Sequence, residues 1–210
     1  MMPETVFYDG FDGPELPPQL RWLYPPQLWS IEDGALIIQA DAQTDYWQRT
    51  HYGFQADNGH FLYVELDPTV HERFVLSTRV RFQPAHQYDQ AGLMVRISPD
   101  CWLKTSVEYE QEEPNRLGAV VTSQGYSDWS TQDFSDEVNA LSLRVRRERG
   151  DYFVEYALTE SSTEPHWTQI RLAKLLADDG HMPIRCGLYA CSPKDAGFRA
   201  AFDYMTIAPG

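Results

Sequence analysis

Four short segments of the 210-residue chain place aromatic side chains within about three residues of a carboxylate or an amide. Such pairs offer a flat apolar surface beside hydrogen-bonding groups, which a hydroxyl-rich ligand such as a sugar requires. The alternative is that each Asp accepts hydrogen bonds from its own turn, which is the commoner arrangement. The segments are TDYWQRT at 44–50, QYDQAGL at 87–93, WLK at 102–104 with Glu108 and Tyr109, and SDWS at 127–130.

These segments supply the candidate residues of one ligand-binding groove. If the groove carries out a reaction, Glu108 is the candidate acid or base, and Lys104 or Arg49 would stabilise developing charge. The predicted ligand-binding residues are Asp45, Trp47, Arg49, Asp89, Gln90, Lys104, Glu108, Tyr109, Asp128 and Trp129.

Metal and nucleophile chemistry have little support in the sequence. Six histidines are scattered without H-x-H spacing, and Cys101, Cys186 and Cys191 form no C-x-x-C pair. A calcium loop of the D-x-D-x-D-G type and a G-x-S-x-G nucleophile elbow are both missing from the sequence. We therefore expect no metal and no cofactor, and three unpaired thiols in a reducing compartment.

The elements that must position these residues are strands. Apolar and polar residues alternate in short segments separated by Gly, Pro, Asn and Asp, and one stretch, 171–177, has helical spacing instead. A dozen short strands predict an all-β fold, a two-sheet antiparallel β-sandwich or jelly roll, as one domain over residues 1–210. The predicted strands are 6–11, 36–40, 44–52, 61–66, 74–82, 91–97, 103–109, 117–123, 141–147, 152–158, 184–191 and 198–207.

Alternation also predicts where the polar side chains go. If three successive strands form a meander, their polar residues share one solvent-facing surface. The alternative is an ordinary solvated face with cross-strand ion pairs. That surface would contain Arg79, Arg81, Gln90, Met94, Arg96, Trp102, Lys104, Ser106 and Glu108.

Composition excludes several classes of partner. Seventeen basic and thirty-one acidic residues give a formal net charge of −14, which would repel nucleic acid and anionic membranes. The first twenty residues lack a basic region followed by an apolar one, and no run of about eighteen apolar residues occurs. We expect a cytoplasmic protein.

The chain resembles a bacterial and fungal family of domains of unknown function. That family is grouped with the fungal regulation-of-enolase proteins, in the concanavalin A-like lectin/glucanase superfamily. The resemblance implies a concanavalin A-like jelly roll with a binding groove on its concave face. The matching pieces are FDG at 11–13, Trp29 with DGAL at 33–36, TDYWQRT at 44–50, YDQAGLM at 88–94, WLK at 102–104, VEY at 107–109, SDWS at 127–130 and GLYACSP at 187–193.

Catalytic glucanases of this superfamily have a motif that looks like E-x-D followed closely by a second Glu on one strand. Here the E-x-D at Glu65 and Asp67 is followed by Pro68 and no second Glu. The expected function is therefore binding of a carbohydrate or another polyhydroxylated small molecule, rather than hydrolysis.

Two alternatives and one question of assembly stay open. The family name implies a protein-interaction role on a metabolic enzyme such as enolase. A glycan hydrolase would need two carboxylates about 5–9 Å apart, drawn from Glu108, Asp89, Asp45 and Asp128. A homodimer formed through an exposed sheet edge is also open.

Overall fold

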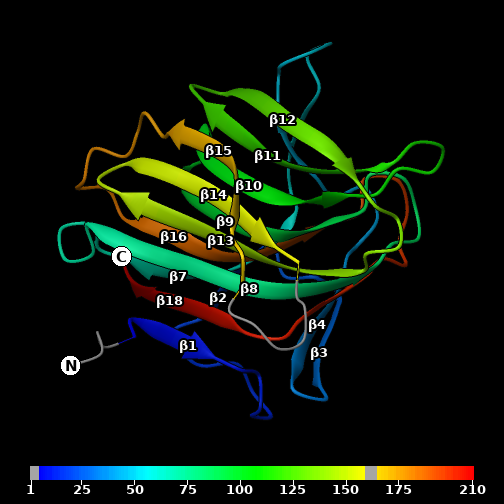
Figure 1. The fold of residues 1–210 in the computed structure, drawn as a ribbon, viewed down its shortest axis with the longest axis horizontal. Coiled ribbons are helices and arrows are strands. Elements are labelled where there is room, and N and C mark those ends of the chain that lie inside the picture. Colours follow the sequence, from blue (N-terminus) through cyan, green and yellow to red (C-terminus); the bar gives the residue numbers. More distant parts are fainter. Residues whose placement is uncertain (1–4, 159–164) are drawn as a thin grey trace.

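The computed structural model describes residues 5–158 and 165–210, which form eighteen β-strands joined by turns and loops (Figure 1). In the described residues no helix is long and apolar enough to cross a bilayer.

The nine-stranded sheet contains, in spatial order, β15 (Thr168–Lys174), β14 (Asp151–Ala157), β13 (Ala140–Glu148), β8 (Arg73–Gln83), β17 (Arg199–Phe202), β4 (Ala35–Gln39) and β3 (Leu28–Glu32), with β18 (Met205–Pro209) paired to β8 and β1 (Phe7–Asp9) paired to β18. The seven-stranded sheet contains β12 (Tyr126–Phe134), β11 (Asn115–Ser123), β10 (Cys101–Glu108), β9 (Gln90–Ser98), β16 (Ile184–Cys191), β7 (His60–Leu66) and β2 (Arg21–Leu23). A separate hairpin consists of β5 (Tyr46–Gln48) and β6 (Gln55–Asp57).

The two sheets pack face to face around an apolar core. Leu76 and Val145 of the nine-stranded sheet and Leu93 and Leu103 of the seven-stranded sheet belong to one buried cluster, and all four are fully buried. Burying a side chain of this size stabilises the fold by about 1.5–3 kcal/mol. All strand pairs inside the sheets are antiparallel, so the predicted two-sheet β-sandwich is confirmed.

Most strand positions follow the alternation, but two predicted strands have other bounds and five strands are not predicted, namely β2, β3, β6, β12 and β15. The predicted strand 198–207 is two strands, β17 and β18, and only Tyr46–Gln48 of the predicted strand 44–52 is extended. The alternation does not reveal β12, since this edge strand exposes residues on both of its faces. The alternation of apolar and polar residues is weakest in an edge strand, because neither of its faces is fully buried.

The helix expected at 171–177 is wrong. Residues 168–174 form β15, an edge strand that pairs with β14. Leu172 and Leu176 are exposed and only Leu175 is buried, so the three leucines do not share a buried face. Two exposed leucines on an edge segment imitate the spacing of an amphipathic helix.

The expected solvent-facing surface needs two corrections. First, the chain crosses from one sheet to the other between β8 and β9, so Arg79 and Arg81 lie in the nine-stranded sheet, where both pair with Asp203. Second, the remaining members do share one face of the seven-stranded sheet, but that face is covered. Only Glu108 is partly exposed, and the buried members are Gln90, Met94, Arg96, Trp102, Lys104 and Ser106.

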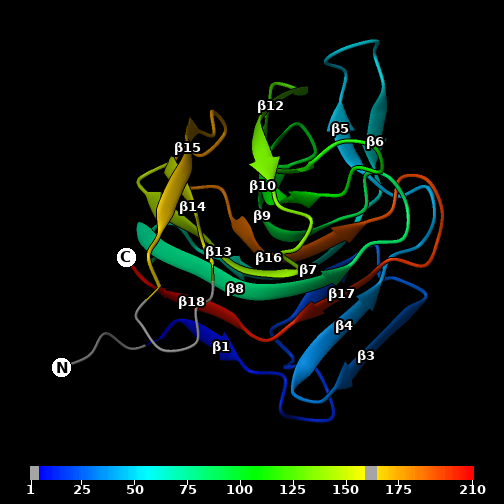
Figure 2. The same ribbon diagram turned by 45° about the vertical axis from the view of Figure 1, so that its right-hand side comes forward.

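The base of the β5–β6 hairpin covers part of that face. Figure 2 shows the hairpin projecting from the body of the sandwich on the side where β12 lies, and it is paired with neither large sheet. Tyr46 packs edge-on against Trp102 and Tyr189, with ring centroids 5.9 and 6.3 Å apart. This second apolar cluster lies on the outer side of the sheet, and it forms the base from which a pocket opens.

Candidate functional site

A pocket of about 840 Å³ opens between the hairpin and the outer face of the seven-stranded sheet. One side is formed by the hairpin, another by β12, and the floor by β10 and β11. Its lining residues are Asp45, Trp47, Thr50, His51, Tyr52, Phe54, Tyr88, Lys104, Glu108, Val120, Tyr126, Ser127, Asp128 and Trp129.

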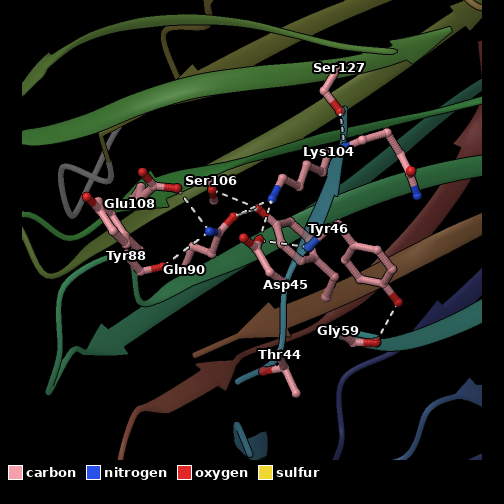
Figure 3. A network of polar contacts seen from close by, with 12 residues as sticks. Thr44, Asp45, Tyr46, Gly59, Tyr88, Gln90, Lys104, Ser106, Glu108 and Ser127 are labelled. Carbon is pink, nitrogen blue, oxygen red and sulfur yellow. Dashed lines mark hydrogen bonds and ion pairs between the residues drawn. The ribbon is translucent and has the colours of Figure 1, made fainter. Parts of the chain in front are cut away.

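The polar floor is a chain of hydrogen bonds centred on Gln90 (Figure 3). Lys104 Nζ donates to Gln90 Oε1 over 2.8 Å, and Gln90 Nε2 donates to Glu108 Oε2 over 2.9 Å and to the Tyr88 carbonyl over 3.2 Å. An ammonium group can only donate, so the Gln90 amide oxygen must face Lys104 and the amide nitrogen must face Glu108. The orientation of the amide is thereby fixed.

Lys104 is held beneath the pocket by three neighbours. Its side chain is only 4% exposed, and its ammonium lies 3.4 Å from Asp45 Oδ1. The same ammonium lies 5.7 Å from the centre of the Tyr189 ring, whose hydroxyl is 3.2 Å from Gln90 Oε1. A buried cation needs such compensation, because its transfer from water is costly.

Glu108 differs electrostatically from an ordinary surface glutamate. Burial raises its pKa from 4.5 to about 8, and the negative charges of Asp45 and Glu110 add to the increase. Lys104 and the Gln90 amide oppose the shift without cancelling it. At neutral pH this carboxyl group is therefore mostly protonated and able to donate a hydrogen bond.

The raised pKa predicts a stability difference that depends on pH. A carboxyl group whose pKa is higher in the folded state stabilises the fold below its usual pKa of 4.5, and that contribution is lost as pH rises to about 8. Relative to the Glu108→Gln variant, the wild-type free energy of unfolding is expected to fall across this window. Urea unfolding of both proteins at a series of pH values measures this difference. A difference in the free energy of unfolding that stays constant with pH would contradict the raised pKa of Glu108.

The walls of the pocket are aromatic. Tyr126 and Trp129 of β12 are 59% and 40% exposed, and Tyr52 at the hairpin turn is 80% exposed. Trp47 is fixed by a hydrogen bond from its indole N–H to the Thr50 carbonyl, 2.8 Å away. The protein thus presents large apolar ring surfaces to solvent around the polar floor, which soluble proteins do mainly where something binds.

Side chains, rather than a sheet ladder, hold the hairpin in place. Arg96 of β9 forms two hydrogen bonds to Asp57 of β6, at 2.6 and 2.7 Å. The Tyr46 hydroxyl donates to the Gly59 carbonyl, and the backbone N–H of Gln48 donates to Ser127 Oγ over 2.9 Å. The wall that carries Trp47 and Tyr52 therefore depends on a few polar contacts.

The structure brings together six of the ten predicted ligand-binding residues and places a seventh below them. Gln90 does not line the pocket but joins two residues that do. Arg49 lies at the margin, where it approaches the Gly125 carbonyl at 3.5 Å and the Tyr126 ring at 5.7 Å. The six lining residues are Asp45, Trp47, Lys104, Glu108, Asp128 and Trp129.

The other two predicted residues do not line the pocket. Asp89 is buried and accepts hydrogen bonds from the backbone amides of Ala85 and His86, both over 2.7 Å, so it caps its own turn. Tyr109 exchanges backbone hydrogen bonds with the 88–89 segment. In the described part of the chain, no group of three or more His, Cys, Asp or Glu side chains is placed to hold a metal ion.

Sequence reasoning missed several pocket residues. Tyr52 and Phe54 sit in a turn whose aromatic content was a usable signal, because large rings are unusual in exposed turns. Tyr126 gave no such signal, because nothing in the sequence shows that the start of β12 approaches the hairpin. Thr50, Tyr88 and Ser127 stand in the four segments assigned to the groove but were not among the ten predicted residues. The remaining missed residues are His51 and Val120.

The amino-acid sequence is similar to a known protein family and to a yeast protein. Residues 22–210 match the model of the family described as "Protein of unknown function (DUF1349)". Over 189 residues the chain is 35% identical to "Regulation of enolase protein 1" of Saccharomyces cerevisiae, and this match covers 90% of this chain and 89% of the relative.

Solved structures agree with the fold. A crystal structure of a functionally unknown protein from Saccharomyces cerevisiae superposes with a TM-score of 0.79 at 32% identity, covering 91% of this chain and 97% of that chain. A xylan β-1,4-xylosidase from Bacillus halodurans C-125 superposes with a TM-score of 0.75 at 20% identity, covering 99% of this chain and 41% of that chain, which shows the fold alone. The chain therefore belongs to the family of proteins of unknown function DUF1349, as its resemblance indicates.

Proposed function

We propose that the protein binds a carbohydrate or a similar polyhydroxylated small molecule in the pocket between the β5–β6 hairpin and the seven-stranded sheet. The observation that carries this proposal is the pairing of exposed aromatic walls with a fixed polar floor. The volume of about 840 Å³ lies in the range of small-molecule pockets, about 300–1,000 Å³.

The arrangement suits a sugar ring for two physical reasons. The C–H faces of the ring are apolar and pack against flat aromatic surfaces such as Trp129 and Tyr126. The hydroxyl groups need donors and acceptors, which Lys104, Glu108 and Asp45 provide. Because Gln90 already fixes the floor, little conformational entropy is lost there when a ligand binds.

Removing one aromatic wall should weaken binding. Trp129→Ala is expected to reduce affinity for a bound sugar by about tenfold, because stacking on a large ring contributes about 1–1.5 kcal/mol. Isothermal titration calorimetry against neutral mono- and oligosaccharides measures it. Trp29→Ala is the matched control, since Trp29 is also 40% exposed but lies on β3 of the other sheet.

The outcomes separate clearly. Binding that Trp129→Ala weakens and Trp29→Ala leaves unchanged supports the proposal. Equal losses in both variants would show a general effect on the fold, and no heat of binding with any sugar would overturn the proposed function.

A second candidate role is regulation of a metabolic enzyme such as enolase, and it is supported by the name of the Saccharomyces cerevisiae relative. The net charge of −14 predicts that contacts with such a partner weaken as salt screens them. Pull-down of purified enolase at low and at raised salt tests this role. No retention at low salt would exclude it for enolase. We also propose a cytoplasmic location, which fits three free, buried thiols.

A further inference from the structure

We propose, on the basis of the proposed function, that Glu108 selects the ligand by donating a hydrogen bond from Oε1 to an uncharged oxygen. The pocket then takes neutral sugars in preference to their carboxylate or ammonium derivatives.

The geometry identifies the atom that faces the ligand. Gln90 Nε2 uses its two hydrogens on Glu108 Oε2 and on the Tyr88 carbonyl, so Oε2 already acts as an acceptor. Among the described residues no hydrogen bond reaches Glu108 Oε1, and Glu108 lines the pocket. A proton on this carboxyl group therefore resides on Oε1, where it can reach a ligand.

The surrounding charges favour the protonated form. Lys104, on the same strand, is the cation that opposes the shift most strongly, and it already contacts Asp45. Arg116 lies opposite Glu108 on β11, where it pairs with Glu113 and Asp133. Asp45 and Glu110 approach from the segments before β5 and after β10, and both disfavour a further negative charge. The other titratable neighbours are the phenols of Tyr88 and Tyr189 and the thiol of Cys191, which supply no positive charge. These neighbours agree with the raised pKa of Glu108, about 8.

Charge balance then decides which ligands fit. With Glu108 protonated, Lys104 and Asp45 cancel, and the floor has no net charge. A ligand carboxylate would bring an uncompensated negative charge beside Asp45, and a ligand ammonium would face Lys104. A hydroxyl or ring oxygen accepts hydrogen bonds from both donors without adding charge.

Calorimetric titration of the full chain with D-glucose, D-galactose and D-xylose, and with the uronates and 2-amino forms of the first two, tests the proposal. At pH 6.5 the neutral sugar that binds should bind at least tenfold more tightly than its charged derivatives. Its affinity should stay level up to about pH 7 and then fall about tenfold for each pH unit above pH 8, because only the protonated Glu108 donates.

Two variants isolate the group responsible. Glu108→Gln keeps an N–H donor at this position but cannot ionise, so the affinity that it retains should not change between pH 7 and 9.5. Glu110→Gln removes a neighbouring carboxylate but leaves Glu108, so the fall in affinity should persist. His51 lines the pocket in all three proteins and cannot explain a difference between them.

Each outcome decides the matter. A flat wild-type profile between pH 7 and 9.5, or an equal fall in Glu108→Gln, would overturn this inference and leave sugar binding in place. The wild-type profile needs no variant to fold. If no sugar binds at any pH, the proposed function fails and the inference fails with it.

Discussion

Replacing Arg147 with Met is expected to lower the free energy of unfolding by about 3–5 kcal/mol, because it leaves a buried carboxylate without its cation. Arg147 contacts both oxygens of Asp178 at 2.7 Å, and the two side chains are 1% and 0% exposed. Arg147 also donates to the carbonyls of His71 and Glu72. The variant therefore loses an ion pair and two hydrogen bonds to backbone carbonyls, although the Glu72 carbonyl still accepts from the Arg149 backbone N–H.

Urea unfolding followed by circular dichroism measures this effect. Arg149→Met is the matched control: Arg149 pairs with Glu72 at 3.4 Å, but both side chains are more than 60% exposed. Exposed pairs contribute at most about 1 kcal/mol, so this variant should unfold almost like the wild type. The double variant Arg147→Met, Asp178→Leu should recover part of the loss, because it removes the unpaired charge. Equal destabilisation by the two single variants would contradict the interpretation.

Replacing Asp57 with Ala is the second change with a large expected effect. It leaves the Arg96 guanidinium, 4% exposed and 5.7 Å from the Tyr46 ring, without a carboxylate. The expected loss of stability is about 3 kcal/mol or more. Because this pair ties β6 to β9, the hairpin wall should also shift, and sugar binding should weaken by at least tenfold.

Glu65→Ala provides the comparison for this effect. It removes the carboxylate 3.3 Å from Arg185, which lies opposite Arg96 in the same sheet, but that pair is about 40% exposed. Stability and binding should both change little. Unfolding curves and calorimetric titrations of the two variants test the comparison, and retained binding in Asp57→Ala would show that the hairpin has other sufficient anchors.

The sequence was sufficient to predict the sandwich, because apolar residues recur at every second position in a strand that buries one face. On β8, buried residues such as Leu76 and Val80 alternate with partly or fully exposed ones such as Arg81, as that period predicts. The period does not say which strands become neighbours, so Arg79 and Arg81 were assigned to the wrong sheet. The connection of residues 84–89 crosses between the sheets instead of turning back in a hairpin, and no local signal distinguishes the two.

The candidate site was predictable in part for a related reason. Polar residues that share a strand face, such as Lys104 and Glu108, must lie near one another, whichever strands flank them. Their burial was not predictable, because it comes from Tyr46 and the rest of a hairpin that folds back over the face. Arg147 shows the same limit: its inward position follows from alternation, but its partner Asp178 lies thirty-one residues away in the sequence.

The β5–β6 hairpin pairs with neither large sheet, so its turn at 49–54 contributes nothing to the ladders that hold the sandwich together. Insertions or replacements in this turn can therefore accumulate during evolution at little cost to folding. The scaffold is free to diversify its recognition while its architecture stays constant, and related chains can share this fold yet differ in what they hold.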